Sequence, residues 1–254
     1  MTKRPFALLL TFVLLSGCAS VPLTTPTSLS STEGLETGKA GRAKIMEKRD
    51  VAALNLVRKV FIQPVRLMTG EAPRYILKPE ERQAVLSEVE AQLCFELSER
   101  YEIVSSADAS DAVVRSAVTW FEPTGGAASG ASAVAGFFIP GPIGLRVPGG
   151  LGGLGAEAEM LASDKQIAAI VWARRAQAIG TDSPSMSRLG DALQFAEPFG
   201  DEAARIMSPS PLPKKRTYPT ASDPCARFGG RIHETGMVTG AITGLYTPAD
   251  RTED

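Results

Sequence analysis

The chain has 254 residues, a formal net charge of −1 and 44% apolar residues. This length and apolar content allow one compact domain with tails, and the near-neutral charge argues against a nucleic-acid partner. Only 6% of the residues are aromatic, so alanine, valine and leucine must build much of the core.

The N-terminus has the order of a secretory signal peptide. Lys3 and Arg4 precede an apolar run, Phe6–Leu15, that is too short to cross a bilayer, which needs about 20 residues. The run ends in Leu15-Ser16-Gly17-Cys18, which resembles the lipobox of bacterial lipoproteins. The resemblance implies that residues 1–17 are removed and that Cys18 is acylated.

Acylation of Cys18 would make the membrane a partner of the mature chain. Ala19 and Ser20 follow, where an aspartate would imply retention in the inner membrane. The resemblance therefore implies a lipid anchor in the outer membrane, facing the periplasm. Loss of Lys3 and Arg4 changes the net charge from −1 to −3.

Residues 18–50 lack hydrophobic periodicity and predict a lipidated, flexible tether. The stretch 39–49 is basic, with Glu47 interspersed. It is interpreted as a solvated linker, with contact to phospholipid headgroups or to anionic cell wall as the alternative.

The folded domain is expected over residues 51–207. Val57–Val65 is β-branched and predicts a strand. Pro79 and the acidic pair that follows it favour the first turn of a helix that runs to Arg100. A short strand is expected over Tyr101–Ser105, and the alternation in Asp111–Phe121 predicts a long one.

A Gly-rich segment, residues 123–155, contains no charge between Pro123 and Ile143. It is interpreted as a loop on the domain, a partner-binding flap or a membrane-inserting segment. Its candidate contact residues are Phe137, Phe138, Ile139 and Arg146. A G-x-G-x-x-G match at Gly150–Gly155 lacks the strand and helix of a dinucleotide site.

Gly155–Ser163 and Gln166–Gln177 predict a hairpin around Asp164-Lys165. Its two glutamates, Glu157 and Glu159, are expected to pair with Arg174 and Arg175 and thereby set the register. Catalysis by the two carboxylates is the alternative.

The rest of the domain is a helical region over Ser183–Met207, in which Pro198 predicts a kink or two shorter helices. Residues 208–254 read as a Pro-rich, mostly irregular tail that contains the basic cluster Lys214-Lys215-Arg216.

Two cysteines remain once Cys18 is lipidated. In an oxidising compartment Cys94 and Cys225 favour a disulfide that draws the tail over the helix. The alternative is two thiols that never meet. His233, the single histidine, lies in the tail, so neither a His-based catalytic set nor a metal site is expected, and no cofactor is expected.

Four stretches together resemble a bacterial lipoprotein family classed as domain of unknown function 3313. They are Lys59–Val65, Ala91–Leu97, the hairpin that begins at Ala156–Met160, and Gly190–Leu193. The family has no established activity, so the resemblance implies no catalytic residue. The element order is also similar to the amino-terminal domain of TolB and to the curli-secretion channel lipoprotein.

These observations predict an α+β domain. Its mixed or antiparallel sheet has about five strands, with two helices on one face, similar to the TolB amino-terminal-domain type. The expected function is non-enzymatic binding of an envelope protein or peptidoglycan. The alternative is a subunit of an oligomeric membrane-associated assembly or secretion channel.

Overall fold

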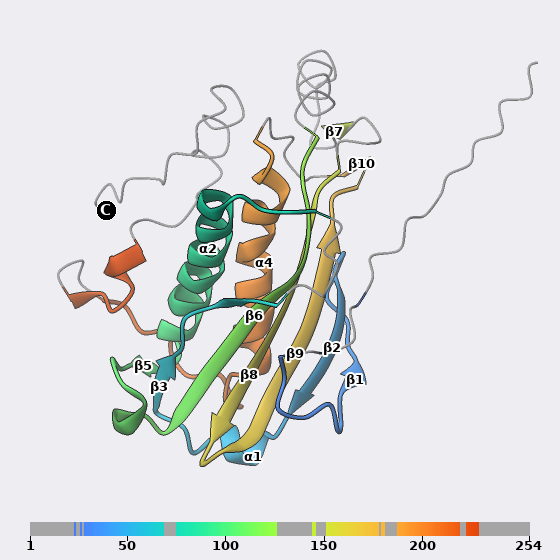
Figure 1. Cartoon of the computed structure of the whole chain (residues 1–254). Coiled ribbons are helices and arrows are strands. Elements are labelled where there is room, and N and C mark those ends of the chain that lie inside the picture. Colours follow the sequence, from blue (N-terminus) through green and yellow to red (C-terminus); the bar gives the residue numbers. More distant parts are fainter. Residues whose placement is uncertain are drawn as a thin grey trace, which may run out of the picture.

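The central feature of the computed structural model is a mixed sheet of eight strands, in the order β1-β2-β9-β8-β6-β3-β5 with β4 beside β6 (Figure 1). The structure describes residues 23, 26, 28–68, 75–125, 144–145, 151–177, 179–180, 187–218 and 222–228. The strands are β1 Glu36–Thr37, β2 Lys44–Arg49, β3 Lys59–Ile62, β4 Arg66–Leu67, β5 Glu102–Ile103, β6 Ala112–Glu122, β8 Gly153–Ala162 and β9 Lys165–Arg175. β7 (Gly144–Leu145) and β10 (Ile179–Gly180) form a separate pair.

The α+β class and the mixed sheet are confirmed, whereas the expected count of about five strands is wrong. β2, β9, β8 and β6 are antiparallel neighbours, while β3 and β4 run parallel to β6. The three strands beyond the expected five are β1, β2 and β4, whereas β5 lies within the short strand predicted over Tyr101–Ser105. β1 and β4 have only two residues each and are too short to produce an alternating pattern in the sequence.

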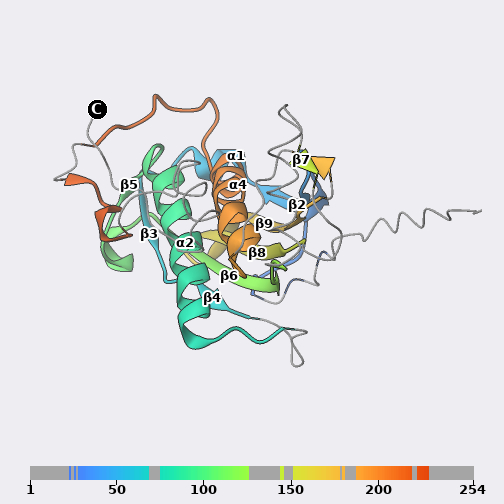
Figure 2. The same ribbon diagram turned by 90° about the horizontal axis from the view of Figure 1, so that it is seen from above.

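Two long helices, α2 (Pro79–Ser98) and α4 (Gly190–Ile206), lie side by side on one face of the sheet (Figure 2). Shorter helical turns are α1 (Val51–Leu54), η1 (Ala107–Ala109) and η3 (Ala226–Phe228). α2 begins as predicted, with Pro79 in its first turn, and the Glu81 carboxylate accepts a hydrogen bond from the Lys78 amide at 2.9 Å.

α4 is one helix that runs through Pro198, so the predicted alternative of two shorter helices is wrong. The missing amide of Pro198 is outweighed by packing, because Phe195, Phe199 and Ile206 are completely buried. The Phe199 ring meets the edge of Trp172 from β9, with ring centroids 5.8 Å apart.

The hairpin β8–β9 is confirmed, but its predicted charge pairing is wrong. Ser163 and Asp164 have φ angles of 48° and 61°, as a two-residue type I′ turn requires. The resulting register sets Arg174 opposite Leu154 and Arg175 opposite Gly153. Arg174 instead stacks on the Phe195 ring at 4.6 Å, and Arg175 binds Glu122 of β6 at 2.5 Å.

The predicted tether, residues 18–50, is corrected over its described part, 28–50. β2 pairs with β9 along six residues, and Ile45 is buried in the core. The sequence of β2 is Lys-Ile-Met-Glu-Lys-Arg, in which four residues are charged and only Ile45 is fully buried. The strand therefore lacks the alternation of apolar and polar residues that would have predicted it. The folded domain therefore begins well before residue 51.

Gly200 allows the close contact between α4 and α2. A Cβ atom at Gly200 would lie 3.0 Å from the Cβ of Gln92 and 3.1 Å from its carbonyl carbon. Gln92 is itself 1% exposed and bonded to Glu88, so it has little space to move.

We expect Gly200→Leu to lower the free energy of unfolding by about 1–3 kcal/mol, because the added side chain overpacks the interface. Chemical denaturation followed by circular dichroism measures this. Arg82→Leu, on an exposed position of α2, is the control and should change stability by less than about 0.5 kcal/mol. Equal stabilities of the two variants would contradict the assigned helix contact.

Candidate anion-binding pocket

The C-terminal segment turns back from α4 across the end of α2. The Tyr101 hydroxyl donates to the Met207 carbonyl at 2.5 Å, and the Arg216 amide donates to the Glu99 carbonyl at 2.8 Å. The disulfide expected from the cysteine count is present between Cys94 and Cys225, with Cα atoms 5.8 Å apart. These bonds hold the described part of the tail, 208–218 and 222–228, against the domain.

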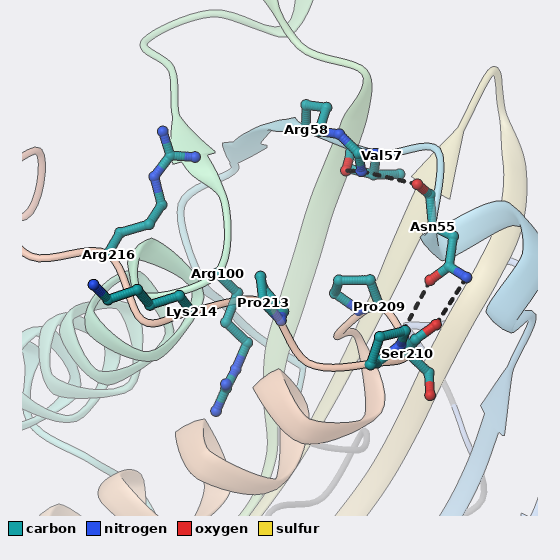
Figure 3. A pocket seen from close by; sticks show the side chains of 10 residues that line it. Asn55, Val57, Arg58, Arg100, Pro209, Ser210, Pro213, Lys214 and Arg216 are labelled. Atoms are coloured by element: carbon teal, nitrogen blue, oxygen red, sulfur yellow. Dashed lines mark hydrogen bonds between the residues drawn. The ribbon is translucent and has the colours of Figure 1, made fainter.

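This path of the tail encloses a pocket of about 440 Å³ between the loop after α1 and the chain that follows α4 (Figure 3). That volume lies within the usual range of small-molecule sites. The lining residues are Asn55, Val57, Arg58, Arg100, Pro209, Ser210, Pro211, Pro213, Lys214 and Arg216.

Four of the ten lining residues are cations and none is an acid. Arg58 precedes β3, Arg100 follows α2, and Lys214 and Arg216 belong to the tail. Figure 3 shows that their charged ends point in different directions and do not meet at one point, with those of Lys214 and Arg216 away from Asn55 and Ser210. Such a spread suits a ligand with several anionic groups better than a single ion.

The Arg58 cation is held by its own loop. Its guanidinium donates to the carbonyls of Asn55 and Val57 at 2.8 and 2.9 Å. The backbone amides of Arg58 and Lys59 both donate to one carboxylate oxygen of Asp111 at 2.8 Å. The amides of Lys59 and Arg58 lower the pKa of Asp111, so this carboxylate stays charged and fixes the loop.

Asn55 also joins the two walls of the pocket. Its side-chain amide donates to the Ser210 carbonyl at 3.0 Å and accepts from the Ser210 amide at 2.8 Å (Figure 3). Leu56 and Leu212, which lie near this junction in the sequence, are 80% and 61% exposed. Both leucines are chain neighbours of lining residues and expose apolar surface.

The pocket lies where both long helices end, so their C-terminal carbonyls supply partial negative charge. Arg49 neutralises part of it by donating to the Ser208 carbonyl at 2.5 Å. Burial raises the pKa of Tyr101, so its hydroxyl keeps its proton and remains a donor to Met207. Among the described residues, no acid forms an ion pair with Arg100, Lys214 or Arg216, and the Nε atom of Arg100 is buried without a hydrogen-bond partner.

The glutamates Glu157 and Glu159 form a second polar centre, on the face of the sheet opposite the helices. Both are buried, at 0% and 1% exposure. Glu157 accepts from the amide and hydroxyl of Ser28 at 2.9 and 2.6 Å, and Glu159 accepts from those of Ser30 at 2.8 and 2.6 Å. We call residues 28–31 the strap.

Neighbouring side chains complete the binding of the strap. Arg115 of β6 binds Glu159 at 2.6 Å, and Gln166 donates to Glu159 and to the Ser31 carbonyl at 2.8 and 3.0 Å. Burial raises the pKa of Glu159, but the hydrogen bonds from Ser30, Gln166 and Arg115 outweigh it and hold this pKa below its ordinary value.

A third buried carboxylate, Asp191, lies where the Gly-rich segment leaves and re-enters the domain. It accepts from the Thr124 hydroxyl at 3.0 Å and from the Gly152 amide at 2.7 Å, and its own amide donates to Thr124. Asp191 therefore fixes both ends of the intervening chain to the start of α4.

Several predicted site residues fall outside the described residues. They are Cys18, Phe137, Phe138, Ile139, Arg146 and His233. In the described part of the chain, no three histidine, cysteine, aspartate or glutamate side chains come together as metal ligands would. Among the described helices, none combines the length and apolar character that a membrane span requires.

The sequence of the chain matches the family described as "Protein of unknown function (DUF3313)" over residues 27–203. The chain belongs to this family. A search of curated proteins gave no match.

Solved structures share parts of the fold. PelC from Paraburkholderia phytofirmans, crystallised as a dodecamer, has 12% identity and a TM-score of 0.39 over 66% of this chain and 98% of its own. A DUF4136 family protein from Bacteroides thetaiotaomicron has 7% identity and a TM-score of 0.30 over 65% of this chain and 92% of its own. With TM-scores this low, the likeness carries no argument about function or assembly.

Removal of the disulfide tests how the pocket wall is held. We expect Cys94→Ser together with Cys225→Ser to lower the free energy of unfolding by about 2–4 kcal/mol, because the bond closes a long loop. Amide hydrogen exchange should rise in residues 209–216, and exchange in the β8–β9 hairpin is the internal control. Unchanged exchange in 209–216 would show that the hydrogen bonds to Glu99 and Tyr101 suffice.

The buried glutamates predict a pH dependence of stability. Because the folded pKa of Glu159 is lowered, its contribution is complete above the ordinary glutamate pKa, about 4.3, and is lost as pH falls through the folded value. At pH 7 we expect Glu159→Gln to lower the free energy of unfolding by about 1–3 kcal/mol.

The difference between Glu159→Gln and wild type should shrink as pH falls below 4, as measured by denaturation at each pH. Glu80→Gln, an exposed residue of the first turn of α2, is the control. A difference that stays constant with pH would contradict the charged state assigned to Glu159.

Proposed function

We propose that this protein is an outer-membrane-anchored, periplasmic lipoprotein that is not an enzyme. It binds an anionic envelope partner, a cell-wall component or a protein, in the pocket of Arg58, Arg100, Lys214 and Arg216. The observation that carries the proposal is the concave site of about 440 Å³ lined by these four cations and no acid. The lipid anchor rests on the resemblance of Leu15–Cys18 to a lipobox.

The arrangement of the acids supports a binding role. Glu157 and Glu159, the carboxylates that the sequence offered for catalysis, hold the strap and Arg115. Asp191 holds the ends of the Gly-rich segment. The pocket itself combines four cations, of which Arg58 is held by its own loop, with proline-rich walls, which suits recognition of an anion. The likeness to the TolB amino-terminal domain remains a prediction.

Charge reversal of two exposed pocket cations tests the proposed binding. We expect Lys214→Glu with Arg216→Glu to weaken cosedimentation with purified peptidoglycan sacculi or crosslinking to envelope proteins by about tenfold, and added salt to weaken wild-type binding. The control, Arg66→Glu with Arg82→Glu, makes the same change in charge at exposed positions outside the pocket. Equal losses in both variants would mean that net charge, rather than the pocket, drives binding.

Two mass measurements test the lipid anchor and the oligomeric alternative. Intact mass of protein extracted from membranes should correspond to residues 18–254 plus acyl chains on Cys18. An unmodified Cys18 would refute the anchor. Mass measurement in detergent micelles separates a single chain, which is 26.8 kDa before residues 1–17 are removed, from the alternative, a multi-subunit assembly or channel.

A further inference from the structure

The turn between β1 and β2 projects from one edge of the sheet (Figure 1). Ala40 and Ala43 form a bridge, and the Ala43 amide donates to the Ala40 carbonyl at 2.8 Å, which closes a two-residue turn. Gly41 has a φ angle of 50°, and a Cβ atom placed on it would meet nothing within 4 Å beyond its chain neighbours. The turn is therefore closed by its own hydrogen bond and extends into open space. We call residues 39–44 the hairpin tip.

The register of this hairpin places like charges opposite one another. Glu36 of β1 is paired with Glu47 of β2, and the same register, continued to the bridge at the turn, sets Lys39 opposite Lys44. Like charges directly opposite one another destabilise a strand pair, whereas a lysine opposite a glutamate stabilises it. Glu47 obtains a cation elsewhere, because Arg205 of α4 binds it at 2.6 Å. The hairpin thus gathers its lysines at the tip at a cost to its own stability.

The hairpin tip presents three cations to solvent. Lys39, Arg42 and Lys44 are all exposed, and the six residues of the tip include no acid. Each lysine or arginine close to an anionic membrane strengthens the association by about fivefold. A projecting turn with three cations therefore has both the charge and the shape to bind a flat anionic surface.

The hairpin tip also lies near the strap, and so within reach of the lipid expected on Cys18. Ser28 of the strap binds Glu157 of β8, and Lys44 of β2 lies two strands across the sheet and two residues along it from Glu157. That separation is about 12 Å. Cys18 lies ten residues before Ser28, at most about 35 Å in extended chain. Because a link of this length lets several parts of the domain reach the membrane, the charge and shape of the tip are what select the contact.

We propose that the hairpin tip binds the phosphate groups of anionic phospholipids in the membrane that holds the anchor. This inference rests on the anchor in the proposed function and is independent of the pocket. Lysine and arginine bind phosphate oxygens through charge-assisted hydrogen bonds. A bilayer presents its phosphates on a flat surface, which a projecting turn touches and the floor of a concave pocket does not. The tip cations thus supply a second contact beside the acyl chains.

The experiment measures how fast individual lysines are acetylated. Full-length protein purified from membranes is added to preformed vesicles of phosphatidylcholine, with or without phosphatidylglycerol, and is treated with an acetylating ester before peptide mass spectrometry. We expect phosphatidylglycerol to slow acetylation of Lys39 and Lys44 by at least about threefold. Lys165, in the β8–β9 turn and 74% exposed, is the internal control and should change by less than about 1.5-fold.

Three results of this experiment would overturn the proposal. Slower acetylation of Lys214 in place of Lys39 and Lys44 would identify the pocket as the lipid contact. Equal protection by inorganic phosphate, added to phosphatidylcholine vesicles, would mean that the tip binds free phosphate rather than a lipid surface. Protection by purified sacculi but not by phosphatidylglycerol would assign the tip to the cell wall.

The variant Lys39→Glu separates lipid binding from a structural role of the tip. It sets a carboxylate opposite Lys44, so the hairpin should tighten and the Ala43 amide should exchange more slowly in phosphatidylcholine vesicles. The effect of phosphatidylglycerol on Lys44 acetylation should nevertheless fall from about threefold to less than about 1.5-fold. Arg82→Glu makes the same change in charge on an exposed position of α2 and should keep the full effect. Equal losses in both variants would show that net charge is responsible and would overturn the tip assignment.

Failure of this inference and failure of the proposed function give different results. If phosphatidylglycerol leaves Lys39 and Lys44 unaffected, the tip assignment is wrong, while the anchor and the pocket still stand. If Cys18 carries no acyl chains, the anchor is wrong, and the tip is tested by flotation of the same protein with vesicles. It should then bind vesicles that contain phosphatidylglycerol but not pure phosphatidylcholine, and Lys39→Glu with Lys44→Glu should abolish that binding. Flotation that the double variant leaves unchanged would overturn the inference.

Discussion

The burial of two carboxylates on the helix-free face of the sheet is the constraint on which the N-terminal half of the architecture depends. A charged group removed from water is strongly destabilising unless hydrogen bonds and opposite charge replace its hydration. Glu157 and Glu159 obtain those partners from Ser28, Ser30 and Arg115. Residues 28–31 therefore lie along β8, and removing them would take away the hydrogen bonds that Ser28 and Ser30 donate to these two buried carboxylates.

The described tail, 208–218 and 222–228, packs against the helix-covered side of the molecule. The contact of Gly200 with Gln92 sets the two long helices close together, and both helices then end at the same side of the sheet. The tail is fixed there by Tyr101 and by the Cys94–Cys225 disulfide. The cationic pocket is a consequence of this closure, because one of its walls belongs to the domain and the other to the tail.

Five of the eight strands and both long helices were predicted from the sequence, and the longest of them have the clearest local signal. β6, the β8–β9 hairpin and α2 each have a pattern that extends over eight residues or more. β2 was missed because Ile45 is its only fully buried residue. The division into two helices at Pro198 was wrong because the helix is stabilised by packing of Phe195 and Phe199, which a propensity argument does not include.

The pocket could not be predicted from the sequence, for a different reason. The cluster Lys214-Lys215-Arg216 is visible in the sequence, but Lys215 binds Glu99 while its two neighbours line the pocket. Nothing local marks Arg58 and Arg100 as their companions, since the tail brings these residues together only after the helices have packed. Likewise, the opposite charges on the β8–β9 hairpin predicted an ion pair between Glu159 and an arginine of β9. The register instead places Arg115 of β6 opposite Glu159, and these two residues form the ion pair.

The strap and the described tail are thus held in the same way. Neither the strap nor the described tail adds a strand to the long sheet, and each is fixed by side chains that would otherwise be left unsatisfied or exposed. The strap depends on a few polar contacts, and the described tail on a few hydrogen bonds and one disulfide, rather than on a ladder of backbone bonds, so their opening free energy is set by those contacts. Single substitutions at Glu157, Glu159 or Cys94 should therefore loosen one end of the chain before they unfold the sheet, which separates the docking of the termini from the stability of the core.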